Sequence, residues 1–406
     1  MKEWKIYTLG NLCTITSSKR IFAEEYQSTG VPFYRGKEVI ELQKGASISS
    51  ELFISEERYN EIKNKHGVPR KGEMLLTSVG TLGIPYVIGN ERFYFKDGNL
   101  TWFRNFNEII PQYLYYWFLS PAGRAQIDSK AIGSTQKALT IDCLSKFEIV
   151  IPPLKEQKRI VSILESIDNK IRTNQAINDN LEQQAQALYK SWFIDFEPFK
   201  DGDFVESELG LIPEGWKVVE LGEVTKQITE KVKNRTDVKV LSPVTTGELV
   251  LSEEYFTKQV FSESIAKYIT VKPLQFAYNP ARVNIGSLGM NTFEFDGCVS
   301  PVYVVFECER DYQYFFDYFR KTEAFKEEVL ARAIGGVRQS LSYKDFSLIK
   351  LIYPPRTIVE KFNRLYSNIL VSINHNKVEA NNLTDMRDTL LPKLMSGELK
   401  INDLDC

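Results

Sequence analysis

The sequence predicts an α+β protein with a pseudo-two-fold internal duplication, in which two similar mixed α/β units alternate with two long helices. Three observations lead to this prediction. Residues 154–196 contain neither glycine nor proline and are rich in good helix formers. Residues 132–153 (IGSTQKALTIDCLSKFEIVIPP) align without a gap with residues 334–355 (IGGVRQSLSYKDFSLIKLIYPP). The pair Trp-Lys followed by Leu-Gly occurs at residues 4–10 and again at residues 216–222.

The globular units are expected to contain short strands and helices. Alternating apolar runs bounded by Gly, Asn and Pro predict strands, and longer apolar and aromatic runs predict helices. An Asp-Gly pair precedes an alternating apolar run in both units, at residues 97–98 and 296–297. Strands are expected at Glu73–Leu76, Ile84–Ile88 and Val302–Phe306, and helices at Tyr113–Leu119 and Tyr312–Ala333.

The long helices carry an apolar seam in alternating steps of four and three, interrupted by asparagine at its centre. A narrow seam of this kind needs a partner helix, and the second helix repeats it at an offset of 202 residues. If the helices pair antiparallel, Asn174 and Asn376 are expected to face each other and hydrogen-bond. Arg387 fits the repeat poorly. The predicted seam comprises Ile160, Leu164, Ile167, Ile171, Asn174, Leu181, Leu188, Phe362, Tyr366, Ile369, Ile373, Asn376, Leu383 and Leu390.

Residues 195–216 are acidic and contain two prolines and three glycines, so a linker without regular structure is expected there. The chain then divides into four parts. The first unit spans residues 1–153, the first helix 154–198, the linker and second unit 199–355, and the second helix with the tail 356–406.

Composition bounds the class of protein. A chain of 406 residues is too long for one core, and 43% hydrophobic with 26% charged residues is typical of a soluble globular protein. The most apolar short run, residues 113–119, is far below the roughly 20 residues that a bilayer requires. The N-terminus lacks the apolar core of a signal peptide, and the five cysteines form no CxxC pair. We expect a cytoplasmic protein without a membrane span, disulfide framework or zinc cluster.

The net charge of −2 excludes a globally basic nucleic-acid binder. Residues 1–153 carry 19 basic and 16 acidic side chains, a net of +3, whereas residues 199–355 carry 19 and 23, a net of −4. Any contact with nucleic acid must therefore use local basic patches or surface from other subunits.

Two similar but non-identical units on a helical spacer suit a linear ligand with approximate two-fold symmetry, and duplex DNA is such a ligand. A coiled-coil scaffold with two protein-binding units fits the same architecture. The architecture by itself favours neither.

Motif strings in a fixed order favour DNA. The chain resembles, over its whole length, the specificity subunit of type I restriction-modification systems. The strings are GVPFYRGKEV (30–39), GEMLLTSVGTLG (72–83), IPPLKEQKRI (151–160), SWFIDFEPF (191–199), ESELGLIPEGW (206–216), YNPARVNIGSLG (278–289), CVSPVYVVF (298–306) and LLPKLMSGELKI (390–401).

The resemblance implies two target-recognition domains that each read one half of a bipartite, asymmetric site in double-stranded DNA. It implies that the helices form an antiparallel coiled coil, which sets the gap between half-sites and docks two modification subunits. Those partners bind S-adenosylmethionine and methylate adenine, and restriction/translocase subunits, with ATP and Mg²⁺, complete the system. This chain would then hold no catalytic residue, metal or cofactor.

The residues agree with a non-catalytic role. The sequence has no GxxxxGK phosphate loop followed by Ser or Thr, and no Asn/Asp-Pro-Pro-aromatic tetrad of amino-methyltransferases. Its two histidines, His66 and His375, make a histidine-based dyad or metal cluster improbable. A self-contained DNA methyltransferase or nuclease stays the alternative.

Candidate DNA contacts are polar or basic residues in the repeat and in the loops. In the first unit they are Ser17, Ser18, Lys19, Arg20, Arg35, Lys37, Thr77, Ser78, Thr81, Ser134, Thr135, Gln136 and Lys137. In the second unit they are Lys231, Lys233, Asn234, Arg235, Thr245, Thr246, Asn279, Arg282, Asn284, Ser287, Arg338 and Gln339.

Overall fold

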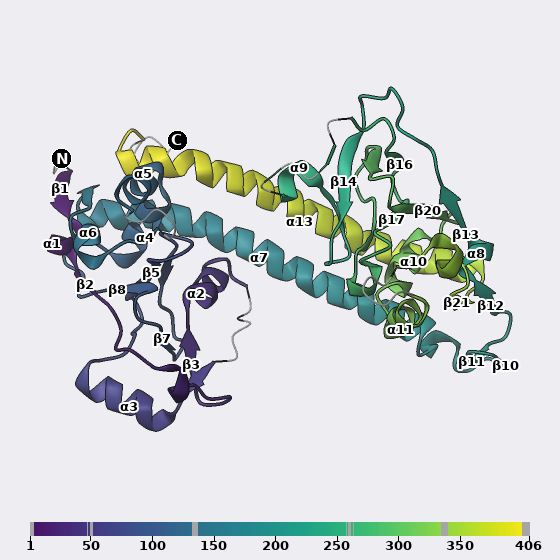
Figure 1. Cartoon of the computed structure of the whole chain (residues 1–406), viewed down its shortest axis with the longest axis horizontal. Helices are drawn as coiled ribbons and strands as arrows, with labels where there is room; N and C mark the ends of the chain where they lie inside the picture. Colours follow the sequence, from purple (N-terminus) through teal and green to yellow (C-terminus); the bar gives the residue numbers. More distant parts are fainter. Residues whose placement is uncertain are drawn as a thin grey trace. The chain divides into compact units, whose positions relative to one another are not determined.

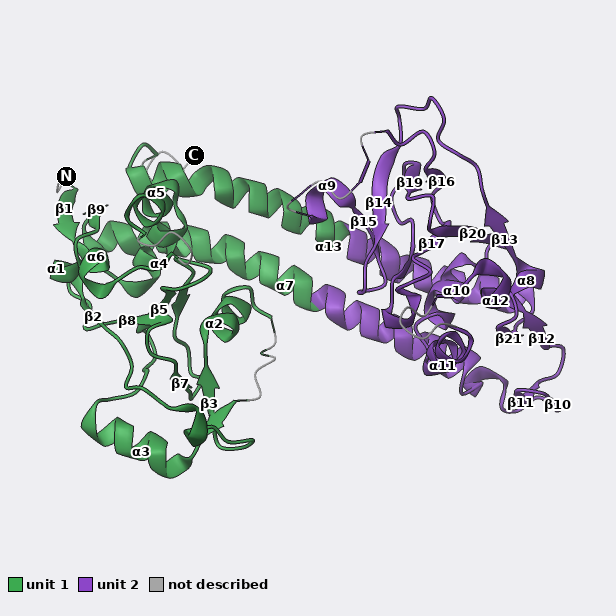
Figure 2. Cartoon of the chain, viewed as in Figure 1, with its two compact units in different colours: residues 1–176, 375–406 green, residues 177–374 purple. Residues whose placement is uncertain are grey.

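The computed structural model describes residues 4–46, 48, 52–131, 137–256, 258, 261–262, 264–333 and 340–399. The chain forms two compact units, residues 1–176 with 375–406 (unit 1) and residues 177–374 (unit 2) (Figure 2). Each unit holds one mixed head and half of each long helix. These helices are α7 (Leu154–Phe193) and α13 (Arg356–Ser396) (Figure 1). The predicted α+β class with two long helices is confirmed.

The head of unit 1 contains a strand pair and two small sheets. The pair is β1 (Lys5–Thr8) with β9 (Glu148–Ile151). The larger sheet has the order β2 (Thr14–Thr16), β8 (Leu100–Arg104), β5 (Met74–Thr77), β6 (Pro85–Val87), and the smaller has β4 (Phe53–Ile54), β3 (Val31–Tyr34), β7 (Tyr94–Phe95). Its helices are α1 (Leu9–Leu12), α2 (Gly36–Gln43), α3 (Glu56–Lys65), α4 (Pro111–Leu119), α5 (Pro121–Lys130) and α6 (Ile141–Ser145).

The head of unit 2 repeats the strand pair and the larger sheet, whereas its smaller sheet has a fourth strand, β16 (Ile269–Val271). The pair is β12 (Lys217–Glu220) with β21 (Lys350–Tyr353). The sheets are β13 (Thr225–Ile228), β20 (Val304–Cys308), β17 (Phe276–Tyr278), β18 (Leu288–Met290), and β15 (Leu249–Leu251), β14 (Lys239–Pro243), β19 (Gly297–Val299), β16 (Ile269–Val271). Its helices are α8 (Leu221–Val224), α9 (Ser252–Tyr255), α10 (Gln313–Phe319), α11 (Glu323–Arg332) and α12 (Tyr343–Phe346). The duplication that the sequence shows at the ends of each unit therefore includes the larger sheet and three strands of the smaller one.

Three local expectations need correction. The single helix expected at residues 312–333 is two helices, α10 and α11, because the Thr322 hydroxyl accepts from Phe325 N (3.2 Å) and begins a new helix. The expected linker holds a short 3-10 helix, η2 (Glu197–Phe199), and a hairpin of β10 (Phe204–Ser207) and β11 (Gly210–Pro213). The two Asp-Gly pairs are not equivalent in position. Asp97 follows β7, whereas Asp296 precedes β19, the corresponding strand.

In unit 1 the halves of the two long helices pack antiparallel. Asn174 Nδ2 donates to Glu379 Oε2 (2.8 Å) and to the backbone oxygen of Asn376 (3.5 Å), while Arg387 pairs with Asp168 (3.0 Å). The later residue of α13, Arg387, pairs with the earlier residue of α7, Asp168, as antiparallel packing requires. Asn174 and Asn376 are neighbours as expected, but the atom of Asn376 that Asn174 contacts is the backbone oxygen.

In unit 2 the corresponding halves also pack antiparallel, through aromatic side chains. The Phe362 ring lies 5.1 Å from that of Phe193 and 6.1 Å from that of Tyr189, measured between centroids. Nearer the unit boundary, Asn178 Nδ2 donates to Ile373 O (3.3 Å). The predicted seam positions of both helices are all buried or half-buried. The helix halves thus pack through apolar seam residues such as Ile160 and Leu164 with added polar pairs in unit 1, and mainly through aromatic rings in unit 2.

Candidate nucleic-acid interface

In unit 1 the turn after β7 draws the candidate loops together. The Arg20 guanidinium pairs with Asp97 (2.8 Å), and Ser17 Oγ accepts from Gly98 N (3.5 Å). Ser78 N donates to Asn99 O (2.8 Å). Loops that are far apart in the sequence therefore meet at residues 97–99.

Two further segments adjoin the loop after β5. Lys137 lies next to the bridge between Val79 and Ala138, and a Cβ on Gly36 would meet the Thr77 side chain at 4.0 Å. This brings Lys137 and the segment that contains Arg35 and Lys37 to the same loop. Lys19, Lys37, Thr81 and Lys137 are exposed.

Arg35 is engaged by its own helix. Its Nη2 lies 2.7 Å from Oε1 of Glu38, a carboxylate that is fully buried, and its backbone N donates to Glu38 Oε2 (2.6 Å). Burial acts to raise the pKa of Glu38, but the hydrogen bonds from Arg35 outweigh it and the pKa is lowered. Arg35 therefore fixes the start of α2 and keeps part of its guanidinium at the surface.

Three candidates turn inward. The Thr77 hydroxyl accepts from Ile84 N (2.9 Å), and the Ser78 hydroxyl lies 2.5 Å from that of Thr101. In unit 2, Ser287 Oγ donates to Pro243 O (2.8 Å). Thr77, Ser78 and Ser287 are buried, so their side chains hold the loops in place and are not available to a ligand.

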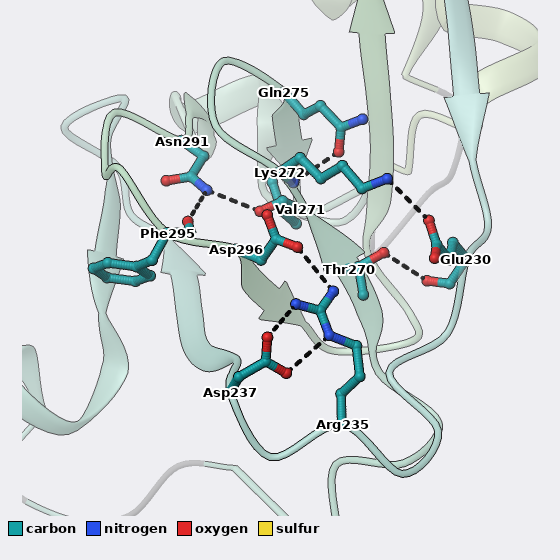
Figure 3. Close-up of polar contacts among 10 residues, drawn as sticks. All are labelled: Glu230, Arg235, Asp237, Thr270, Val271, Lys272, Gln275, Asn291, Phe295 and Asp296. Atoms are coloured by element: carbon teal, nitrogen blue, oxygen red, sulfur yellow. Dashed lines mark hydrogen bonds and ion pairs between the residues drawn. The ribbon is translucent and has the colours of Figure 1, made fainter.

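In unit 2 the first basic segment follows β13. Lys231, Lys233 and Asn234 are exposed. Arg235 differs from them because it donates to Asp237 (2.9 and 2.6 Å) and to Asp296 (2.8 Å) (Figure 3). Sequence reasoning missed these carboxylate partners, and Asp296 lies sixty-one residues away in the chain.

The second segment of unit 2 borders a cavity of about 140 Å³. Arg282 is exposed and Asn279 half-buried, and both line the cavity. Tyr268 lines it too and packs against Val232 of the basic segment, so this tyrosine lies between the cavity and that segment. The other lining residues, none of which the sequence indicated as a DNA contact, are Val240, Leu241, Ser242, Pro243, Phe256, Phe261, Ser300 and Tyr303.

The remaining candidates are distributed as follows. Thr245 and Thr246 are exposed in the turn after β14, and the Thr246 hydroxyl donates to Glu248 (3.0 Å). Ser18 and Asn284 are half-buried. Five candidates, Ser134, Thr135, Gln136, Arg338 and Gln339, lie outside the described residues.

Within the described part of the chain, no cluster of three or more His, Cys, Asp or Glu residues is placed to hold a metal ion. No helix in that part is both long enough and apolar enough to cross a membrane.

Comparisons with known proteins give one consistent family. Residues 1–183 match the family model described as the type I restriction modification DNA specificity domain. The chain is 26% identical to the type I restriction enzyme MjaIX specificity subunit of Methanocaldococcus jannaschii, covering 99% of this chain and 95% of that protein. It is 21% identical to the type I restriction enzyme HindI specificity subunit of Haemophilus influenzae, covering 98% and 100%.

A solved structure shares the fold. The crystal structure of the type I restriction-modification system S subunit from M. genitalium superposes with a TM-score of 0.59 at 15% identity, covering 97% of this chain and 96% of that one.

Proposed function

Because the chain belongs to the family of type I restriction-modification specificity subunits, we propose that its two heads each read one half of a bipartite, asymmetric DNA site. The heads are residues 1–153 and 199–355, and the spacer helices are residues 154–198 and 356–406. The chain is a non-catalytic subunit, and it works in the cytoplasm as part of a larger complex.

One observation carries this proposal: the larger sheets of the two heads share a strand order but differ in the side chains of equivalent loops. Asn279 N donates to Ser287 O (3.1 Å) as Thr77 N donates to Ile84 O (3.1 Å), so the two loops close in the same way. Between these bonds, unit 1 has the uncharged SVGTLG and unit 2 has PARVNIG with Arg282. Loops with the same backbone closure but different side chains for contacting bases suit two half-sites of different sequence.

The proposed contacts are exposed polar candidates, together with the half-buried Asn279 that lines the cavity beside Arg282. Lysines suit phosphates, and arginine or amide side chains suit base edges. The set is Lys19, Lys37, Thr81 and Lys137 in unit 1, and Lys231, Lys233, Asn234, Thr245, Asn279 and Arg282 in unit 2. Asn284 and Arg35 border this set.

The outer faces of the helices are proposed to dock two modification subunits. Val371, in the unit 2 half of α13, is 69% exposed, and Val378, in the unit 1 half, is 60% exposed. Apolar side chains exposed on a regular helix suit a protein partner. S-adenosylmethionine, and the ATP and Mg²⁺ of restriction/translocase subunits, are assigned to those partners.

The test is to map methylated adenines across the genome of a host that carries the chain with its modification subunits. We expect one bipartite motif with two unlike halves. Methyl transfer or DNA cleavage by the isolated chain, given S-adenosylmethionine or Mg²⁺, would instead support a self-contained enzyme. A chain that shows no sequence-dependent DNA affinity even with its modification subunits would be a protein scaffold.

A further inference from the structure

The segment Glu230–Asp237 of unit 2, called here the basic turn, is held tightly although it is a loop. Val232 is buried in a small apolar cluster with Val238, Tyr268 and Cys298. Val232 N donates to Tyr268 O (2.9 Å). Burial of one side chain and pairing of its backbone fix the middle of the turn.

The first residue of the basic turn is also held. Thr270 donates to Glu230 O from both its backbone N (2.8 Å) and its hydroxyl (3.2 Å), and Lys272 lies 3.5 Å from the Glu230 carboxylate (Figure 3). The start of the turn, which follows β13, is therefore fixed against β16.

Arg235 holds the far end. Its guanidinium makes a two-bond fork with Asp237 and a third bond with Asp296, the residue before β19 (Figure 3). These hydrogen bonds raise the pKa of Arg235 above its ordinary value. A planar guanidinium held by two carboxylates has its orientation fixed by the protein.

The two lysines of the basic turn flank the buried Val232 and are exposed. Neither forms an ion pair with another residue that the structure describes. Lys233 has φ +55°, a left-handed conformation that glycine or asparagine adopts more readily than lysine. The backbone at this position would suit an uncharged asparagine or glycine better, so the lysine places an exposed charge there at a cost in backbone strain.

We propose that the basic turn is a preformed phosphate-binding site. Lys231 and Lys233 contact the DNA backbone, and Arg235 is a positioning residue that holds them in place and does not itself contact DNA. This assignment rests on the proposed DNA-reading function and adds to it the division of labour within one loop.

Unit 1 has a looser version of the same arrangement. Lys19 follows the end of β2 by three residues, as Lys231 follows the end of β13. The next residue, Arg20, pairs with Asp97, but its side chain is 66% exposed and makes one bond where Arg235 makes three. Asp97 follows β7, whereas Asp296 precedes the equivalent strand β19. The two heads therefore pair the arginine of this loop with a carboxylate from opposite ends of the equivalent strand.

The test uses the full chain with its modification subunits and a random-sequence duplex, because phosphate contacts do not depend on sequence. The logarithm of the affinity is measured against the logarithm of the salt concentration. We expect Lys231→Gln and Lys233→Gln each to reduce the slope by about 0.9, the value for one phosphate contact. Lys350→Gln is the control, since Lys350 lies on β21 outside the basic turn and pairs with Glu208, and it should leave the slope unchanged.

The role of Arg235 is tested by the sign of one effect. Asp296→Asn removes a negative charge and releases Arg235, so a direct contact by Arg235 predicts tighter binding. A positioning role predicts weaker binding at every salt concentration. Asp237→Asn serves as the second variant should Asp296→Asn fail to fold, and melting curves report folding in both.

Strain is tested by Lys233→Asn, which should melt no lower than the wild type while its salt slope falls. Unchanged slopes in both glutamine variants, tighter binding by Asp296→Asn, or a lower melting temperature for Lys233→Asn would each overturn this assignment. None of these outcomes would remove the bipartite motif that the proposed function predicts for methylated DNA, so the two failures can be distinguished.

Discussion

Asp168 on α7 and Arg387 on α13 form an ion pair in unit 1, with 3.0 Å between Oδ1 and Nη1. The other oxygen of Asp168 accepts from the Tyr116 hydroxyl on α4 (2.7 Å), so one carboxylate joins the head to both helices. Arg387 is the position that fits the helical repeat poorly, since its counterpart is Ala185. In unit 2 the counterpart of Tyr116, Tyr318, instead contacts Glu182 (3.2 Å).

Arg387→Met should destabilise unit 1. It leaves the Asp168 carboxylate, which is only 13% exposed, with the Tyr116 hydroxyl but without its cation. Arg387 is itself partly exposed, so solvent screening reduces the cost to about 1–2 kcal/mol. The measurement is the free energy of unfolding in urea. The control is Arg364→Met on the exposed face of α13, and an equal loss in both variants would contradict the role of the ion pair.

Asn174→Leu should raise the free energy of unfolding by about 1 kcal/mol, because it replaces a buried polar group with an apolar one. Asn174 is 1% exposed, and its Oδ1 has no hydrogen-bond partner among the residues that the structure describes. We expect the substituted helices to pair in a less specific register, because an asparagine in the seam fixes the register of the two helices. Thermal melting and light scattering measure the two effects. Gln175→Leu, on the exposed neighbour, should show neither. A less stable Asn174→Leu chain would show that the polar seam is a net stabiliser.

Glu38 should make the stability of unit 1 depend on pH in the acid range. Its pKa is lowered in the folded chain, so the unfolded chain binds its proton first as the pH falls. The stabilisation is therefore fully present above the unfolded pKa of about 4.3, and it is lost as the pH falls through the folded pKa. Urea titrations from neutral to acid pH should give a flatter curve for Glu38→Gln than for the wild type. Parallel curves would exclude this contribution.

Arg282→Ala should alter one half-site only. If Arg282 reads a base, its removal costs about 1–3 kcal/mol at that position and relaxes the sequence requirement there. Methylation mapping should show one degenerate base in one half of the motif, with the other half unchanged. Arg310→Ala, elsewhere in the same head, is the control. A uniform loss of methylation without relaxed sequence would mean that Arg282 contacts phosphate.

Inserting four residues between Asn174 and Leu181 of α7, with four at the facing point of α13 after Ile373, should lengthen the spacer by about 6 Å. At about 3.4 Å per base pair the gap between half-sites should grow by one or two base pairs. Both half-sites should keep their sequences. The same insertion in the turn between β10 and β11 should leave the gap as it is. A changed half-site would contradict the division between heads that read and helices that measure.

The sequence by itself determined the duplication, the two long helices and their seam. Helix periodicity and repeat offsets are local or regular in the chain, so a seam such as Ile160 to Leu188 can be recognised without coordinates. The resemblance to type I specificity subunits rests on strings of the same kind. The polar centre of the seam was also predicted, although Glu379 as the main partner of Asn174 was not.

Only the tertiary structure decided which candidate side chains reach the surface. Thr77 and Arg235 look like equally good contacts in the sequence, but one is buried beneath its own loop and the other is held by Asp296. Burial and ion pairing in loops depend on residues far away in the chain, and no periodicity connects them. The sequence therefore determined the duplication and the long helices, and long-range packing decided which candidate side chains are exposed to a ligand.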